Sequence, residues 1–330
     1  MRFGKVISAA LFGGLCAVTA LAPAQARELK IGTISAAGSP WDKAMQRFAE
    51  VVKDETGGDL TVKVYTDGQL GDIQRMLTGM QLGNVEMGYF GLGSVLFLKG
   101  AEAMNVIYVP YLFKDREQAQ KALNSDVFKA LYDDIAKKTG VRVFAAFGAR
   151  SPRALQTTKG PIMKPEDVAG MKLRIPGLDI FKATFETLGV QMVPMGMTEI
   201  YTALSKGIIE GQDNGFDLAM PLRFYEVAKY WSATDHAYEV TGWFISEKLW
   251  QSLNDDQRAA LVEAAEAGGE VTSKLEAELA EKSIQTLKDN GVTYVVPDRE
   301  AFREKLKDVY KAFDGKAWPK GFVDQVRAID

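Results

Sequence analysis

Apolar residues recur along the chain with two alternating spacings, one typical of strands and one typical of helices. Residues 28–34 form a short apolar segment, and from Trp41 to Val52 the apolar positions then return every three to four residues, which places them on one helical face. Ser39 and Pro40 precede that helix, where a capping side chain and a proline in the first turn are favoured. The same alternation continues to the C-terminus.

This pattern predicts strands at 28–34, 60–66, 85–90, 141–147, 171–175, 190–194 and 292–296. It predicts helices at 40–56, 72–82, 115–138 with a break near Asn124, 178–188, 198–206, 255–288 and 299–313, with a short helical start at 165–167. Strands that alternate with helices form parallel or mixed sheets covered on both faces. These units are too many for one sheet, so we predict an α/β protein of two lobes. We expect the chain to pass from the first lobe to the second near residues 148–151.

The N-terminus has the pattern of a secretory leader. Arg2 and Lys5 precede an uncharged apolar run over 6–21, Pro23 then interrupts it, and Ala24-Gln25-Ala26 supplies small residues for cleavage after Ala26. The alternative is a retained membrane anchor, but the run is shorter than the ~20 residues that span a bilayer. Cys16, the one cysteine, lies inside this run, and its neighbours Gly13 and Leu15 do not suit lipid attachment. The mature chain therefore has no disulfide or thiol chemistry.

Charge and composition exclude several classes of function. Loss of the leader takes the formal net charge from −3 to −5, which argues against a nucleic-acid partner. The chain has one histidine, His236, and it has no phosphate loop, dinucleotide fingerprint or nucleophile elbow. We therefore expect no enzyme activity, no cofactor and no metal. Pairs of carboxylates can catalyse reactions without histidine or cysteine, so a periplasmic lyase or glycosidase is the alternative. His236 itself fits a surface or capping position, with a ligand contact as the second interpretation.

Three polar segments could bind an anion. Arg174 stands at the end of a predicted strand before a proline, where ligands bind in open α/β sheets, and a guanidinium can hold a carboxylate through two hydrogen bonds. The glycine-framed segment 207–215 includes Asn214, and Arg150 and Arg153 lie at the predicted crossing. Taken singly, these segments also fit a structural ion pair, a polar turn and solvated surface charge.

Taken in order, these segments resemble the solute-binding proteins of tripartite ATP-independent periplasmic (TRAP) transporters, the DctP-like family, over essentially the whole mature chain. The resemblance is carried by the segments LKIG at 29–32, GQLGD at 68–72, KGPI at 159–162, PEDVAGMKLRIP at 165–176, LGV at 188–190, EIYTAL at 199–204 and GQDN at 211–214.

The resemblance implies roles for particular residues. Arg174 matches the arginine that grips the solute carboxylate, and Asn214 matches an asparagine that contacts the solute. A second arginine is expected about twenty residues before the first, where Arg153 fits best and Arg150 is the rival.

Further cleft residues are expected where the chain departs from its relatives. Asp213 and Phe216 stand at such positions, and we expect Asp213 to face solute hydroxyls and Phe216 to form a wall. Met197 and Phe90 are expected either to line the cleft or to lie in the core. Gln212 stands where relatives that use a metal have an aromatic residue, so no metal is expected.

The same resemblance implies an architecture and a mode of action. It implies a leader at 1–26, a first lobe from 27–150 plus about 240–278, and a second lobe from 151–239 plus about 279–330, joined by hinge strands and a long helix. Such a protein closes on a small carboxylate solute in the periplasm, as a monomer, and delivers it to TRAP membrane permease subunits without ATP. A sugar acid or hydroxy acid is favoured, and a C4-dicarboxylate or 2-oxo acid remains open. A non-transport sensor is the other alternative.

Overall fold

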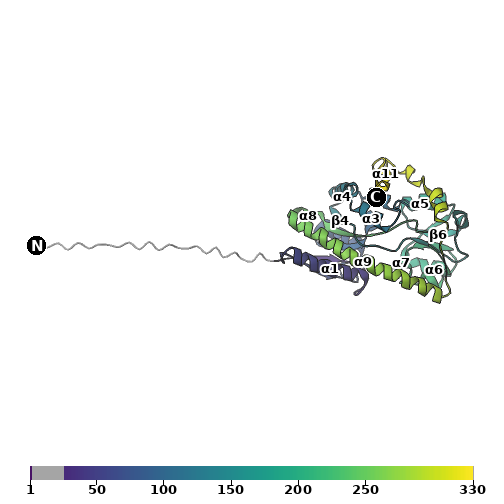
Figure 1. The fold of residues 1–330 in the computed structure, drawn as a ribbon, viewed down its shortest axis with the longest axis horizontal. Coiled ribbons are helices and arrows are strands. Elements are labelled where there is room, and N and C mark those ends of the chain that lie inside the picture. The colour runs from purple at the N-terminus through teal and green to yellow at the C-terminus, as the bar shows by residue number, and fades with distance from the viewer. Residues whose placement is uncertain (2–25, 330) are drawn as a thin grey trace.

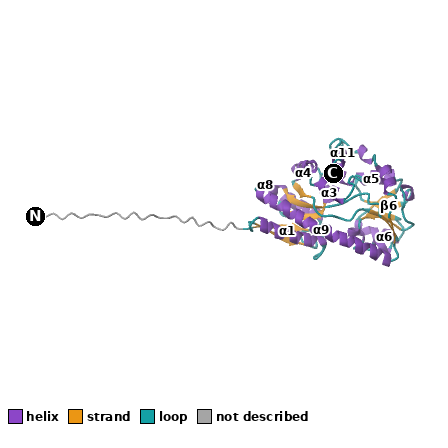
Figure 2. Cartoon of the chain, in the orientation of Figure 1, coloured by secondary structure: helices purple, strands orange, loops and turns teal. Residues whose placement is uncertain are grey.

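The computed structural model describes Met1 and residues 26–329, so almost all of the predicted leader lies outside the described residues (Figure 1). Two groups of strands, each flanked by helices, form two lobes (Figure 2). This is the two-lobed α/β architecture with mixed sheets that the sequence predicts. Within the described part of the chain, no helix is both long and apolar enough to cross a membrane.

The first lobe contains a five-stranded mixed sheet in the order β2–β1–β3–β10–β4. β1 pairs in parallel with β2 and β3, whereas β10 is antiparallel to β3 and β4. The elements of this lobe are β1 (Arg27–Gly32), α1 (Pro40–Glu55), β2 (Leu60–Tyr65), α2 (Ile73–Leu82), β3 (Met87–Gly91), the 3-10 helices η1 (Leu92–Phe97) and η2 (Glu102–Tyr108), α3 (Arg116–Leu123), α4 (Asp126–Thr139), β4 (Val141–Ala145), β10 (Thr241–Ser246) and α8 (Glu247–Ser252).

The second lobe contains a six-stranded mixed sheet in the order β11–β9–β5–β8–β6–β7. β5 is antiparallel to β8 and β9, and the other pairs are parallel. Its elements are β5 (Ala154–Thr157), η3 (Pro165–Val168), β6 (Lys172–Ile175), α5 (Asp179–Thr187), β7 (Gln191–Pro194), η4 (Met197–Glu199), α6 (Ile200–Ser205), β8 (Gly211–Asn214), α7 (Phe216–Ala219), η5 (Phe224–Glu226), β9 (Tyr230–Ser232), β11 (Thr293–Val295), α10 (Arg299–Leu306) and η6 (Val309–Ala312).

Local signals place several helix ends where the sequence predicts them. Ser39 caps α1 by accepting a hydrogen bond from the Asp42 amide at 3.2 Å. The predicted break near Asn124 separates α3 from α4, and the Asn124 Nδ2 donates both to the Gln120 carbonyl of α3 at 2.8 Å and to the Ala146 carbonyl at 2.9 Å. These contacts tie the two helices to the end of β4.

The interpretation of the segment 207–215 as a polar turn is wrong for residues 211–214, because these form β8 between β5 and β6. All four residues are buried. Their polar side chains are hydrogen-bonded inside the protein, and such a strand has no apolar alternation that sequence periodicity could detect.

Helix α9 (Asp255–Asp289) spans both lobes, packing on α1 near one end and on α7 and β11 near the other (Figure 1). Gly268 and Gly269 lie where it crosses the middle of the molecule. A Cβ on Gly268 would stand 2.7 Å from the Ala44 carbonyl oxygen, and one on Gly269 would stand 2.4 Å from the Phe147 Cβ. The glycine pair therefore lets α9 approach both α1 and the interlobe crossing.

The C-terminal segment returns to the first lobe. In α11 (Phe322–Arg327), the ring of Phe322 meets Phe128 of α4 edge to face, with centroids 5.2 Å apart. Gln118 of α3 donates to the Ile329 carbonyl at 2.8 Å. The sequence-based boundary assigns the whole of 279–330 to the second lobe, whereas these contacts place its last helix on the first.

Candidate solute-binding site

Three of the segments that connect the two lobes meet at one crossing, and two of them pair as antiparallel extended chains. The Arg150 amide donates to the Glu239 carbonyl and the Arg153 amide to the Ala237 carbonyl, each at 3.0 Å. An isolated bridge joins Ala149 to Val240, next to the first of these hydrogen bonds. Helix α9 is the third segment, and its Ser273 hydroxyl accepts from the Ala149 amide at 3.0 Å.

Buried ion pairs occupy the crossing. The Arg150 Nε lies 2.7 Å from the Asp217 Oδ2, and the Arg153 Nε lies 2.7 Å from the Asp213 Oδ2. The Glu239 Oε2 lies between the two arginines, 3.2 Å from the Arg150 Nη1 and 3.3 Å from the Arg153 Nη1. All five side chains are nearly inaccessible, so each charge depends on its partners rather than on water.

The carboxyl groups of this cluster do not titrate alike. Burial by itself raises the pKa of Asp213, but Arg153 and His236 outweigh burial and hold the pKa well below its usual range. At Asp217, burial outweighs the attraction of Arg150, and repulsion from Glu239 adds to it, so the pKa is raised. Arg153 therefore has the more firmly ionised partner.

His236 is buried beside this cluster, so the interpretation of a surface histidine is wrong. Its Nδ1 lies 2.8 Å from the Thr234 Oγ1, and its Nε2 lies 3.3 Å from the Asp213 Oδ2. Phe185 packs edge to face against the ring. The histidine thus helps to hold Asp213 toward Arg153.

Arg174 differs from the other two arginines. It is 6% exposed, its Nε donates to the Met195 carbonyl at 3.1 Å, and no carboxylate pairs with it among the described residues. Its Nη1 is buried without a hydrogen-bond partner in the described chain. Burial lowers the pKa of Arg174, Asp213 partly offsets that effect, and Arg153 lowers the pKa further. Among the described residues of this site, Arg174 is thus a buried cation without a carboxylate in salt-bridge contact.

The register of the second sheet divides the expected site residues between two faces. Arg174 of β6 lies opposite Gln212 of β8, so Arg174, Gln212 and Asn214 share one face. Asp213 lies opposite Leu155 of β5 and points to the other face, where it meets Arg153. The structure therefore brings Arg174 together with Asn214 and separates both from Asp213 and Arg153.

The segment after β7 touches both residues of the Arg174 face. Met195 supplies the carbonyl that holds Arg174, and the Met197 Sδ lies 3.9 Å from the Asn214 Nδ2. The Asn214 Oδ1 is buried without a hydrogen-bond partner among the described residues. Met197 remains partly exposed, as a residue lining a cleft would be.

The two predicted aromatic residues are placed differently. Phe216, the first residue of α7, stacks on Trp231 with centroids 4.4 Å apart and borders Asp217. Phe90 is fully buried in the core of the first lobe, where it stacks on Phe244 at 4.6 Å. Of the two interpretations of Phe90, these contacts favour the core position.

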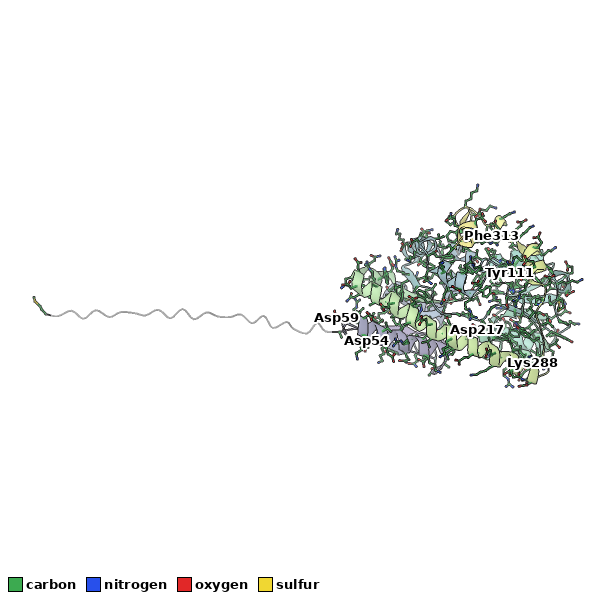
Figure 3. All side chains as sticks on the ribbon, in the orientation of Figure 1. Asp54, Asp59, Tyr111, Asp217, Lys288 and Phe313 are labelled. Carbon is green, nitrogen blue, oxygen red and sulfur yellow. The ribbon has the colours of Figure 1, made fainter. Side chains whose placement is uncertain are left out.

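Sequence reasoning missed residues that only the fold connects to the site. These are Gln156 in β5, Asp217 in α7 and Glu276 in α9. Figure 3 labels Asp217, which lies beside α9. Nothing in the sequence distinguishes these residues from the other amides and acids, because their respective partners Asn214, Arg150 and Ser151 lie 58 to 125 residues away.

Glu276 gives the crossing a titration near neutrality. Burial and the charge of Asp217 raise its pKa from 4.5 to about 7, although Arg150 and the Ser151 hydroxyl oppose them. Between pH 4.5 and about pH 7, Glu276 is protonated more fully in the folded protein than in the unfolded chain. The free energy of unfolding therefore falls as the pH rises through this window. We expect this group to remove about 1–3 kcal/mol of unfolding free energy between pH 5 and pH 8.

Urea unfolding at several pH values measures this effect. Glu276→Gln should flatten that part of the profile, and Glu270→Gln, at an exposed position of the same helix, should leave it unchanged. If Glu276→Gln leaves the pH dependence of the unfolding free energy unchanged, another group is responsible for it.

Comparison with known proteins places this geometry in context. A family model described as "Bacterial extracellular solute-binding protein, family 7" (DctP) matches residues 31–316. A solute-binding protein of Roseobacter denitrificans is 32% identical over 306 residues, covering 91% of this chain and 93% of that protein. The 2,3-diketo-L-gulonate-binding periplasmic protein YiaO of Escherichia coli is 29% identical over 331 residues, covering 100% of this chain and 99% of YiaO.

Solved structures of TRAP periplasmic solute-binding proteins share the fold. One from Ochrobactrum anthropi, with its C-terminus bound in the ligand-binding pocket, has a TM-score of 0.82 at 30% identity and covers 92% of this chain and 94% of its own. One from R. denitrificans with bound L-galactonate has a TM-score of 0.74 at 30% identity, with coverage of 92% and 98%. Another from that organism, with bound β-D-glucuronate, has a TM-score of 0.79 at 26% identity, with coverage of 92% and 100%.

Proposed function

Because this chain belongs to the family 7 bacterial extracellular solute-binding proteins, the DctP-like subunits of TRAP transporters, we propose that it captures a sugar acid in the periplasm and delivers it to a membrane permease. The mature protein begins after Ala26, acts as a monomer and binds its solute without transforming it. Relatives solved with L-galactonate and β-D-glucuronate support a sugar acid as the solute class.

The observation that carries this proposal is the isolation of Arg174. Arg150 and Arg153 are neutralised by carboxylates of the protein itself, whereas Arg174 is buried with an unpaired Nη1. A solute carboxylate would neutralise this guanidinium and accept its hydrogen bonds. Asn214 on the same sheet face can contact the rest of the solute.

Arg153 has a different role in this proposal from the one predicted. Its Nε, Nη1 and Nη2 bond to the Asp213 side chain, to Glu239 and to the Asp213 carbonyl. Its guanidinium also lies over the Phe181 ring of α5 at 4.8 Å. We therefore assign Arg153 to bracing the crossing, and Arg174 to gripping the solute. Arg150, the rival second contact, is likewise committed to Asp217 and Glu239.

We expect the solute to favour the closed form, because some of its contacts can be made only when both lobes enclose it. In this structure Tyr108 of the first lobe packs against Phe181 of the second, with ring centroids 4.9 Å apart. A solute bound more tightly by such a closed form shifts the population toward it by the difference in its two affinities. The closed form is then what the permease recognises.

A thermal-shift screen tests the proposed solute class. The mature chain from Arg27 onward should melt at a higher temperature with galactonate, glucuronate or a related sugar acid, because a ligand of the native state at 100 times its Kd adds about 2.7 kcal/mol. Succinate is the control for a C4-dicarboxylate site. Recovery of the solute unchanged after denaturation should accompany binding. If none of the acids raises the melting temperature, or if the acid is converted to another compound, the proposal is contradicted.

A further inference from the structure

Gln156 of β5 has its side-chain orientation fixed by two backbone carbonyls. Its Nε2 donates to the Ala154 carbonyl at 2.9 Å and to the Asn214 carbonyl at 2.8 Å, and the side chain is 1% exposed. Both partners are acceptors only, so the amide nitrogen must face them. The Gln156 Oε1 therefore faces away from these carbonyls, toward the neighbouring strand.

The orientation of the Gln156 amide fixes that of the Gln212 amide, which in turn fixes that of Asn214. The Gln156 Oε1 accepts from the Gln212 Nε2, so the Gln212 Oε1 must point the other way, where it accepts from the Asn214 Nδ2 at 2.5 Å. The Asn214 Nδ2 also lies toward the Met197 Sδ. Reversal of any one amide would set nitrogen against nitrogen or oxygen against oxygen. We call these three side chains, Gln156, Gln212 and Asn214, the amide relay.

The relay leaves one group free at its end, the Asn214 Oδ1, which can only accept. This atom and the Arg174 Nη1 are both buried and unpaired, they belong to neighbouring strands on one sheet face, and their side chains contact the same segment, Met195 to Met197. A donor and an acceptor so placed match a carboxylate with a hydroxyl beside it. A carbonyl oxygen in place of the hydroxyl would meet the Oδ1 with no hydrogen between them.

We propose that the amide relay fixes Asn214 as an acceptor and thereby selects hydroxy acids over the corresponding 2-oxo acids. This inference rests on the proposed function, because it refines the solute class at the Arg174 site. Gln156 is then a positioning residue for selectivity, although it lies behind Gln212 and Asn214. Leaving a buried acceptor unpaired weakens binding about ten- to a hundredfold.

Titration calorimetry on matched acids tests the wild-type protein. D-gluconate and 2-keto-D-gluconate differ only at C2, as do D-galactonate and its 2-keto form. The hydroxy acid of each pair should bind at least about tenfold more tightly. Equal or tighter binding of the 2-keto acids overturns the inference but leaves the proposed function standing. Failure of all these acids to bind, together with failure of every acid in the thermal screen, overturns both.

Gln156→Leu tests whether the relay is the cause. Without the two carbonyl contacts, Gln212 and Asn214 can reverse their amides, so the preference for the hydroxy acid should fall at least fivefold, mainly through better binding of the 2-keto acid. Gln118→Leu is the matched control, because Gln118 is also a buried amide that donates to a carbonyl, but it lies on α3. If Gln156→Leu does not fold, Gln212→Met should show the same loss. An unchanged ratio in the folded variant overturns the relay.

Discussion

Replacing Arg174 with alanine is expected to abolish tight solute binding without destabilising the unliganded protein. Truncating one member of a buried, hydrogen-bonded charge pair removes about 2–5 kcal/mol, or roughly thirtyfold to several thousandfold in Kd. In the unliganded protein, however, Arg174 is a buried charge with no ion pair among the described residues. Its removal also removes a desolvation penalty, so the unfolding free energy should change by less than about 1 kcal/mol.

Calorimetry and urea unfolding of the same preparations separate these two effects. Arg174→Lys should bind with intermediate affinity, since it keeps the charge but loses the planar fork of donors. Arg47→Ala is the control for loss of an arginine, because Arg47 is exposed and its salt bridge in the described chain is with Glu50 on the same helix. Near-wild-type affinity in Arg174→Ala would refute the assignment of the carboxylate site.

Replacing Arg153 with methionine should have the opposite result, a large loss of stability. Methionine keeps much of the apolar volume against Phe181, but Asp213 then remains fully buried and has lost the guanidinium that offsets its burial, with His236 still 3.3 Å from its Oδ2. Removing one partner of a buried ion pair in this way destabilises proteins by about 3–5 kcal/mol. The urea midpoint should fall accordingly, and any protein that remains folded should still respond to the solute through Arg174.

The double variant Arg153→Met with Asp213→Asn provides the internal control. It removes the uncompensated carboxylate as well, so it should be more stable than Arg153→Met alone. Together with the single variant Asp213→Asn it completes a cycle that measures the coupling between the two residues. A loss below about 1 kcal/mol in Arg153→Met would mean that the pair contributes little to the fold. Loss of binding with full stability would instead make Arg153 a direct solute contact, as the family resemblance predicts.

Much of the architecture could be predicted from short-range pattern. Ser39, with an acidic residue three positions later, begins α1, and Asn254 with Gln257 begins α9 through a capping box. These signals lie within one helical turn, so no distant contact is needed to interpret them. The strand β6 is predictable in the same way, because its apolar residues are adjacent in the sequence and Pro176 directly follows its last residue.

Polar strands were not found by the same reasoning. β8 has the sequence Gly211-Gln212-Asp213-Asn214, which resembles a turn because glycine, aspartate and asparagine favour turns or loops when their neighbours are unknown. Its burial depends on β5 and β6, which supply hydrogen bonds to both of its edges. β-structure is decided by such cross-strand partners more than by intrinsic preference.

The sequence by itself determined the two-lobed α/β class and the resemblance that singled out Arg174 and Asn214. Tertiary structure alone decided which arginine is left for a solute, because Asp217 and Asp213 neutralise Arg150 and Arg153 across 67 and 60 residues of chain. It also decided which atom Asn214 offers, since a glutamine 58 residues away sets the direction of its amide. A charge or an amide has no fixed role until its partners are in place, and those partners are brought together only by folding.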